Sequence, residues 1–151
     1  MAERLYTMKD VVDITGIPST TLRFYDKKGM LAFVRRSVSG VRIFTDKDIA
    51  LLRMIQFLRN VDMPIKEITH FISLYMEGAS AEEERMSLLE NHLLALRKEV
   101  REGKEKIRAA AFMNDLLQKK MDDKTLDSDL TYSLTDKDIP EDTKVFFSRR
   151  D

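Results

Sequence analysis

The chain has 151 residues, of which 43% are hydrophobic and 34% are charged, so it can bury a core although it is highly charged even for a soluble domain. It contains no cysteine, which excludes disulfides, thiolate metal sites and cysteine nucleophiles. No segment approaches the roughly 18 to 20 apolar residues of a membrane span or the core of a signal peptide, so the expected compartment is the cytoplasm.

The net charge is zero, but the charges are unevenly distributed along the chain. The first 60 residues hold 11 Lys and Arg against 6 Asp and Glu, about +5, and the remainder holds 15 against 20, about −5. This asymmetry favours an anionic partner for the N-terminal part alone.

A first helix is predicted at about Met8 to Ile14. Thr7 precedes it and Asp10 follows three residues later, which is an acidic variant of the capping box. The helix should stop at Gly16, because glycine tolerates the positive φ of a tight turn, and Pro18 discourages continuation.

A second helix is predicted from Ser19, taken as its N-cap, to Lys28, with Gly29 as the C-terminal stop. Two short helices joined by a Thr-Gly-Ile-Pro turn form a helix-turn-helix candidate. Such pairs also occur in many α domains that bind no nucleic acid, so this pattern alone leaves the function open.

The next segment predicts a small hairpin and two further helices. Extended runs at Val34 to Arg36 and Val41 to Phe44 flank a polar tip. Thr45, with Asp48 at the third position, begins one helix, and Pro64 stands at the start of the other.

From Ser80 onward a long charged helix carries apolar residues at alternating steps of three and four. The stripe runs through Met86, Leu89, Leu93, Leu96, Val100, Gly103, Ile107, Ala110, Asn114, Leu117 and Met121. Its outer faces are almost wholly charged, which favours pairing with a helix of another molecule. The alternative is a helix that folds back on its own domain. Asp122 to Asp151 is acidic and predicted to be partly ordered at best.

Three motifs at these spacings, "TLRFYD", "SGVRIFT" and "MPIKEI", resemble the MerR family of bacterial transcription regulators across roughly the first 120 residues. The resemblance implies a mainly α fold with a winged helix-turn-helix DNA-binding domain, a helix pair and a long antiparallel coiled-coil dimerisation helix. We therefore expect a DNA-binding domain with its connecting helices at 1–78, a dimerisation helix at 79–121 and a tail at 122–151. Leu89, Leu93, Leu96, Val100 and Ile107 are the predicted dimer contacts.

The second helix would be the recognition helix, whose first turns reach base edges in the major groove. Arg23 can pair bidentately with guanine, whereas Thr20 and Thr21 either contact bases or cap the helix. Tyr25 can donate to a phosphate, and Phe24 replaces a tyrosine that is common in the family. The full predicted DNA-binding set is Thr7, Thr20, Thr21, Arg23, Tyr25, Arg36, Arg42 and Arg59. Arg35 is a further arginine of the wing, and Lys66 is a weaker candidate.

The family's C-terminal part senses a metal ion, an oxidant, an aldehyde or an organic molecule. Two histidines, His70 and His92, are too few for a convincing metal site, so no metal or cofactor is predicted. Aldehyde-responsive members carry a cysteine where this chain has Phe57. The remaining option is noncovalent binding of a small organic effector near Phe71 and Tyr75.

The sequence thus predicts a homodimeric DNA-binding regulator that recognises a palindromic promoter operator. By resemblance it would activate by bending and untwisting the promoter spacer, and so act on RNA polymerase indirectly. The alternative is a DNA-binding accessory or architectural protein without an effector. An enzyme has little support, because no acid–base pair, nucleophile or phosphate-binding loop, and hence no catalytic residue, can be identified in the sequence.

Overall fold

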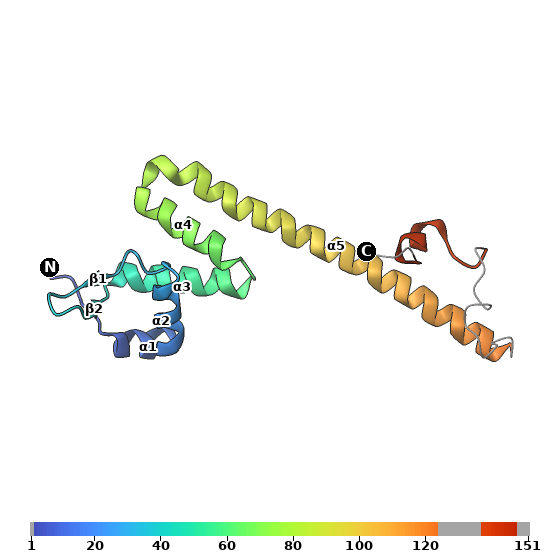
Figure 1. The fold of residues 1–151 in the computed structure, drawn as a ribbon, viewed down its shortest axis with the longest axis horizontal. Coiled ribbons are helices and arrows are strands. Elements are labelled where there is room, and N and C mark those ends of the chain that lie inside the picture. The colour runs from blue at the N-terminus through green and yellow to red at the C-terminus, as the bar shows by residue number, and fades with distance from the viewer. Residues whose placement is uncertain (1, 124–136, 148–151) are drawn as a thin grey trace. The chain divides into compact units, whose positions relative to one another are not determined.

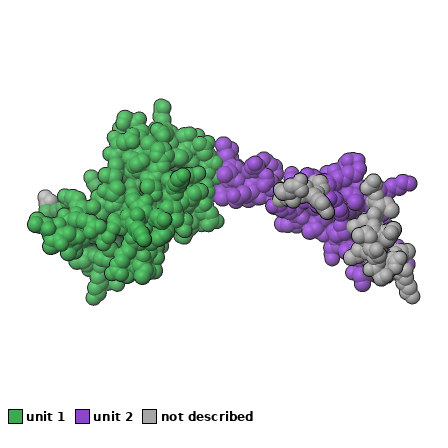
Figure 2. Space-filling model, viewed as in Figure 1, with its two compact units in different colours: residues 1–93 green, residues 94–151 purple. Residues whose placement is uncertain are grey.

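A computed structural model describes residues 2–123 and 137–147. The chain divides into two compact units, Met1–Leu93 and Leu94–Asp151, here called the winged unit and the C-terminal unit (Figure 2). The described elements are α1 (Met8–Thr15), α2 (Ser19–Lys27), β1 (Arg35–Arg36), β2 (Arg42–Ile43), α3 (Asp46–Asn60), α4 (Ile65–Glu77), α5 (Glu82–Asp122) and two 3-10 helices, η1 (Ala79–Ala81) and η2 (Glu141–Phe147) (Figure 1). The mainly α winged helix-turn-helix fold predicted from the sequence is confirmed, as is the long helix.

The predicted capping box at the start of α1 is present. The Thr7 hydroxyl accepts a hydrogen bond from the Asp10 N–H at 3.2 Å, and the Thr7 N–H donates to the Asp10 carboxylate at 2.8 Å. The helix ends at Thr15, one residue later than predicted. Gly16 follows with φ at 72° and donates its N–H to the Val12 carbonyl at 2.9 Å, which closes the last turn.

The start of α2 differs from the prediction. Ser19 is the first helical residue rather than the N-cap, which is Pro18, and no side chain caps this helix. The proline ring holds φ at −58°, so the chain enters the helix directly after it. At the other end, Gly29 adopts φ +80°, a conformation that a residue with Cβ rarely takes.

The hairpin is antiparallel, with Arg35 opposite Ile43 and Arg36 opposite Arg42. Its strands are shorter than predicted. Phe44 leaves the ladder and bridges to Tyr6, with backbone hydrogen bonds of 2.8 and 3.0 Å. The N-terminal segment therefore lies beside the wing, and the Phe44 side chain is fully buried.

The core of the winged unit lies where α1 packs on α2 and α3 and where α3 packs on α4 (Figure 1). Its fully buried large side chains are Phe44, Leu22, Met30, Leu52, Ile55, Leu58, Met63, Ile68, Ile72 and Val11. The capping box of Thr45 and Asp48 starts α3 as predicted. Pro64 occupies the N-cap of α4.

The first turns of α5 belong to this core. Leu88 and Leu89 pack against it, and His92 Nε2 donates to the Val61 carbonyl at the end of α3, at 2.7 Å. Leu89 was predicted as a dimer contact. Its side chain is partly buried against the core of its own winged unit, as the fold-back alternative expects over this short stretch, and its role in a dimer stays a prediction.

Beyond Leu93, α5 carries an uncovered apolar stripe. Leu93, Val100 and Ile107 are 47%, 59% and 70% exposed, and Leu96 is half-buried. In the C-terminal unit, Phe146 of η2 faces α5 across a small hollow. The prediction for the tail falls largely on residues 124–136 and 148–151, outside the described residues. None of the described helices has the length and hydropathy needed to cross a membrane.

Candidate nucleic-acid interface

Helix α2 presents polar groups that have no partners in the described parts of the chain. Thr20 and Arg23 are exposed and Thr21 is half-buried. No hydrogen bond or ion pair engages these three side chains among the described residues, and neither threonine caps the helix. The capping reading of Thr20 and Thr21 is therefore wrong, and their hydroxyls are free to meet a ligand.

The two aromatics of α2 are placed differently. Tyr25 is 6% exposed, so its ring is part of the core, while Phe24 is 37% exposed. The rings lie 6.2 Å apart in a tilted arrangement, and the Lys28 ammonium lies 5.8 Å from the Phe24 centroid. The Tyr25 hydroxyl has no hydrogen-bond partner among the described residues. It is not fully buried, so it still reaches solvent. A phosphate contact through it stays a prediction.

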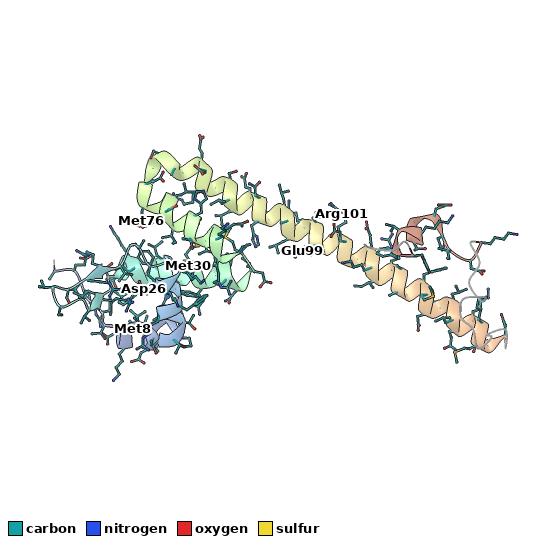
Figure 3. All side chains as sticks on the ribbon, viewed as in Figure 1. Met8, Asp26, Met30, Met76, Glu99 and Arg101 are labelled. Carbon is teal, nitrogen blue, oxygen red and sulfur yellow. The ribbon has the colours of Figure 1, made fainter. Side chains whose placement is uncertain are left out.

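The wing is fastened to α2 by one carboxylate. Asp26, near the C-terminal end of α2 (Figure 3), pairs with Arg36 at 3.1 Å and also with Arg42. Arg36 also donates to the Gly40 carbonyl at the hairpin tip, at 3.0 Å. We call these three charged side chains, Asp26, Arg36 and Arg42, the wing clamp.

The two arginines of the clamp have different exposure. The Arg42 side chain is 22% exposed and the Arg36 side chain 51%. The Nε of Arg42 is buried without a hydrogen-bond partner among the described residues. Arg42 is therefore held in the clamp, whereas about half of the Arg36 side chain stays exposed to solvent. Asp26 was missed in the sequence, because only the hairpin register brings it to both arginines.

The remaining predicted contacts differ in their partners. The Thr7 hydroxyl is engaged with Asp10, to which it also donates at 2.8 Å. Arg59 is half-buried near the end of α3 and has no acidic partner among the described residues. Arg35 pairs with Glu3 at 2.9 Å, and both side chains are largely exposed.

Two further polar contacts fix the N-terminal segment. The Tyr6 hydroxyl donates to the Asp46 carboxylate at 2.8 Å, and this bond raises the pKa of Tyr6 above its ordinary value. The Thr7 backbone N–H and then its hydroxyl lower the pKa of Asp10. Both contacts favour one arrangement of the segment beside the wing.

Comparison with known proteins identifies this arrangement. The model of the MerR helix-turn-helix regulatory family matches residues 6–74. A crystal structure of HiNmlR, described as a MerR family regulator lacking the sensor domain and bound to promoter DNA, is 36% identical with a TM-score of 0.58. The match covers 78% of this chain and 94% of that one. The chain belongs to the MerR family.

Other MerR-family relatives agree in the same region. A regulator from Bacillus thuringiensis is 33% identical, with a TM-score of 0.56, over 70% of this chain and 95% of its own. An uncharacterised regulator from Haemophilus influenzae is 44% identical over 57% of this chain and 64% of its own length. AdhR from Bacillus subtilis is 31% identical over 49% of this chain and 53% of its own length. The chain thus spans less than two thirds of these curated relatives.

In this MerR-family chain the predicted effector residues lie together. Phe71 is 5% exposed and Tyr75 39% exposed, and both line one surface hollow of the winged unit. The histidines serve other contacts: His70 pairs with Glu84 at 3.1 Å and His92 bonds Val61. Among the described residues, no group of three or more His, Cys, Asp or Glu side chains is arranged to hold a metal ion.

Proposed function

We propose that the chain is a DNA-binding transcription regulator that recognises a palindromic promoter operator as a homodimer in the bacterial cytoplasm. The observation that carries this proposal is the polar surface of α2, where Thr20 and Arg23 have no partner among the described residues and lie on the helix to which Asp26 fastens the wing. A 36% identical relative bound to promoter DNA supports it.

In this proposal each polar group has a distinct task. Arg23 reads a base edge in the major groove, and Thr20 contacts a neighbouring base or its methyl group. Arg36 and Arg59 neutralise phosphates, and Tyr25 donates a hydrogen bond to the DNA backbone. A contact from Thr7 would require its hydroxyl to turn away from Asp10. Arg42 contributes mainly by holding the wing against Asp26.

The homodimer is supported by α5. Its exposed stripe from Leu93 through Leu96, Val100 and Ile107 repeats at heptad spacing, which suits a partner helix of the same sequence. In the antiparallel pairing that the family resemblance implies, two winged units would meet the two halves of a palindromic site.

The regulatory step would be a distortion of the promoter. Bending and untwisting a spacer costs deformation energy that protein–DNA contacts must offset, and it changes how RNA polymerase meets the two promoter elements. A noncovalent effector would shift this step by binding one DNA-bound conformation more tightly than another. The alternative is an effector-independent DNA-binding accessory protein, and the similarity to a relative described as lacking the sensor domain supports it.

The decisive experiment compares two arginine variants on an operator isolated by selection from random duplexes. Arg23→Ala should weaken operator binding by on the order of 1–3 kcal/mol and reduce its discrimination against random DNA. Arg97→Ala, which removes an exposed arginine of α5, is the matched control and should bind normally. Fluorescence anisotropy at several salt concentrations measures both. Full discrimination by the Arg23→Ala variant would refute the groove assignment.

A further inference from the structure

The winged unit contains a hollow that its fold does not fill. It has a volume of about 350 Å³ and lies between α3, α4 and the start of α5. Its apolar lining comes from Ala50, Leu51, Met54, Phe71 and Tyr75, and two cationic side chains, Lys47 and Arg85, complete it. We call it the α3–α4 hollow.

We propose that the α3–α4 hollow binds a small organic anion with an aromatic or apolar body. The proposal deepens the effector step of the proposed function and rests on it for its regulatory meaning. The binding itself is argued from the hollow alone.

The lining has a buried floor and an open wall. Leu51 and Phe71 are 8% and 5% exposed, so they are fixed by the core behind them. Met54 and Tyr75 are 41% and 39% exposed, although both present apolar surface. An apolar ligand seated on this floor would remove that surface from water, which is favourable. Met54 can also adapt its shape to an aromatic ring.

The two cations lack counter-charges. The Arg85 guanidinium lies 5.7 Å from the centre of the Tyr75 ring, and neither it nor Lys47 has an acidic partner among the described residues. The acids adjacent in sequence to Lys47 and Arg85 have other partners. Asp46 accepts from Tyr6, Asp48 from the Thr45 N–H and Glu84 pairs with His70. Cations at an apolar hollow therefore select an anionic head group on an apolar body.

The size of the hollow favours a small molecule over a protein segment. Ligand pockets span roughly 300–1,000 Å³, and about 350 Å³ lies at the small end of that range. A docked helix needs a groove long enough for anchors over two turns. The lining extends over two turns of α3, but it takes only a single turn of α4 and one residue of α5.

The position of the hollow links ligand binding to the DNA-binding surface. Helix α3, which supplies Lys47 and Ala50, begins directly after β2 of the wing and Phe44. Arg85 belongs to the first turn of α5. A ligand that contacts both helices binds most tightly to one relative placement of them, which is the requirement for an effector.

The charge requirement is tested on the full-length chain without DNA. The probes are 1-anilinonaphthalene-8-sulfonate and N-phenyl-1-naphthylamine, which share an apolar body but differ in the anionic group. We expect the sulfonate to bind more tightly, and the Lys47→Gln/Arg85→Gln variant to lose that preference on the order of tenfold, since two partly exposed ion pairs are removed. The control variant, Arg101→Gln/Lys104→Gln, removes two exposed cations of α5 (Arg101 is labelled in Figure 3) and should bind like the parent.

The location is tested by filling the hollow from an exposed helix position. Ala50→Phe should abolish the binding of both probes, with circular dichroism checking the fold. Sulfonate binding that survives Ala50→Phe, or equal affinity for the two probes, would overturn the proposal. So would a dimer that binds neither probe because a second copy covers the hollow. Operator binding is measured separately on the same variants. If the parent chain binds no operator, the proposed function is refuted, whereas the ligand site is still supported by the probe binding.

Discussion

Replacing Asp26 by asparagine should disconnect the wing from the recognition helix. The substitution keeps the size of the side chain and removes the charge that Arg36 and Arg42 share. Arg42 cannot turn freely into water, because its side chain is only 22% exposed and its Nε is already buried without a partner in the described chain. Arg36, at 51% exposure, can.

The size of the effect follows from this partial burial. Exposed ion pairs contribute about 0–1 kcal/mol, and breaking a fully buried pair costs about 3–5 kcal/mol. With Arg42 and Asp26 at 22% and 25% exposure, we expect Asp26→Asn to lower the free energy of unfolding by about 1–2 kcal/mol. The matched control is Glu3→Gln, which breaks the exposed pair with Arg35 and should cost about 0–0.5 kcal/mol.

Two measurements separate the structural role from the electrostatic one. Urea unfolding reports the stability of both variants. Anisotropy titrations report operator affinity against salt concentration, where each phosphate contact contributes a slope of about −0.9 in log–log form. Asp26→Asn should weaken operator binding and leave the slope unchanged, because the wing is no longer held beside α2 while Arg36 keeps its phosphate contact. If Asp26→Asn is as stable as Glu3→Gln, the clamp does not hold the wing.

Three further predictions concern the supporting structure. Thr7→Ala should lower the free energy of unfolding by about 1 kcal/mol through loss of the α1 cap. The folded-state pKa of Asp10 is lowered from 3.8. Its contribution to stability is therefore present above pH 3.8 and is lost as the pH falls through the lowered pKa. Acid unfolding of the parent and of the Thr7→Ala variant measures this loss. Gly29→Ala should cost about 1 kcal/mol in urea unfolding, from positive-φ strain rather than a clash, since the nearest atom to its Cβ would be 3.7 Å away. Leu96→Glu should dissociate the dimer in sedimentation experiments while leaving the melting of the winged unit unchanged, whereas Leu89→Ala should destabilise that unit itself.

The sequence was sufficient for features set by local chemistry. The capping boxes of α1 and α3 depend on residues three apart, so Thr7 and Thr45 mark both helix starts without tertiary information. The hairpin followed from two apolar runs around a polar tip. Arg23 was assigned from its position in the first turns of a helix, and the structure leaves it exposed and unpaired among the described residues.

The sequence was insufficient wherever distant segments meet. Asp26 reads as an ordinary acid of a helix end until the hairpin register brings Arg36 and Arg42 to it. The prediction of Ser19 as the N-cap of α2 was wrong for a local reason. Pro18 is the N-cap, and its ring fixes the φ angle with which the chain enters the helix. Of the α3–α4 hollow, the sequence predicted only Phe71 and Tyr75. Its cations come from α3 and α5 and could not be brought together without the fold.

The heptad pattern of α5 illustrates why one period can serve two structures. Leu89 and Leu93 are successive members of the same stripe, yet Leu89 packs on the core of the winged unit and Leu93 is 47% exposed. Heptad spacing requires only that a helix present one apolar face, and it does not specify what covers that face. The hydrogen bond from His92 to the Val61 carbonyl lies between these two residues. It is the last described hydrogen bond from an α5 side chain to the rest of the winged unit. A substitution of Leu89 therefore tests the stability of that unit, and a substitution of Leu93 tests the proposed association.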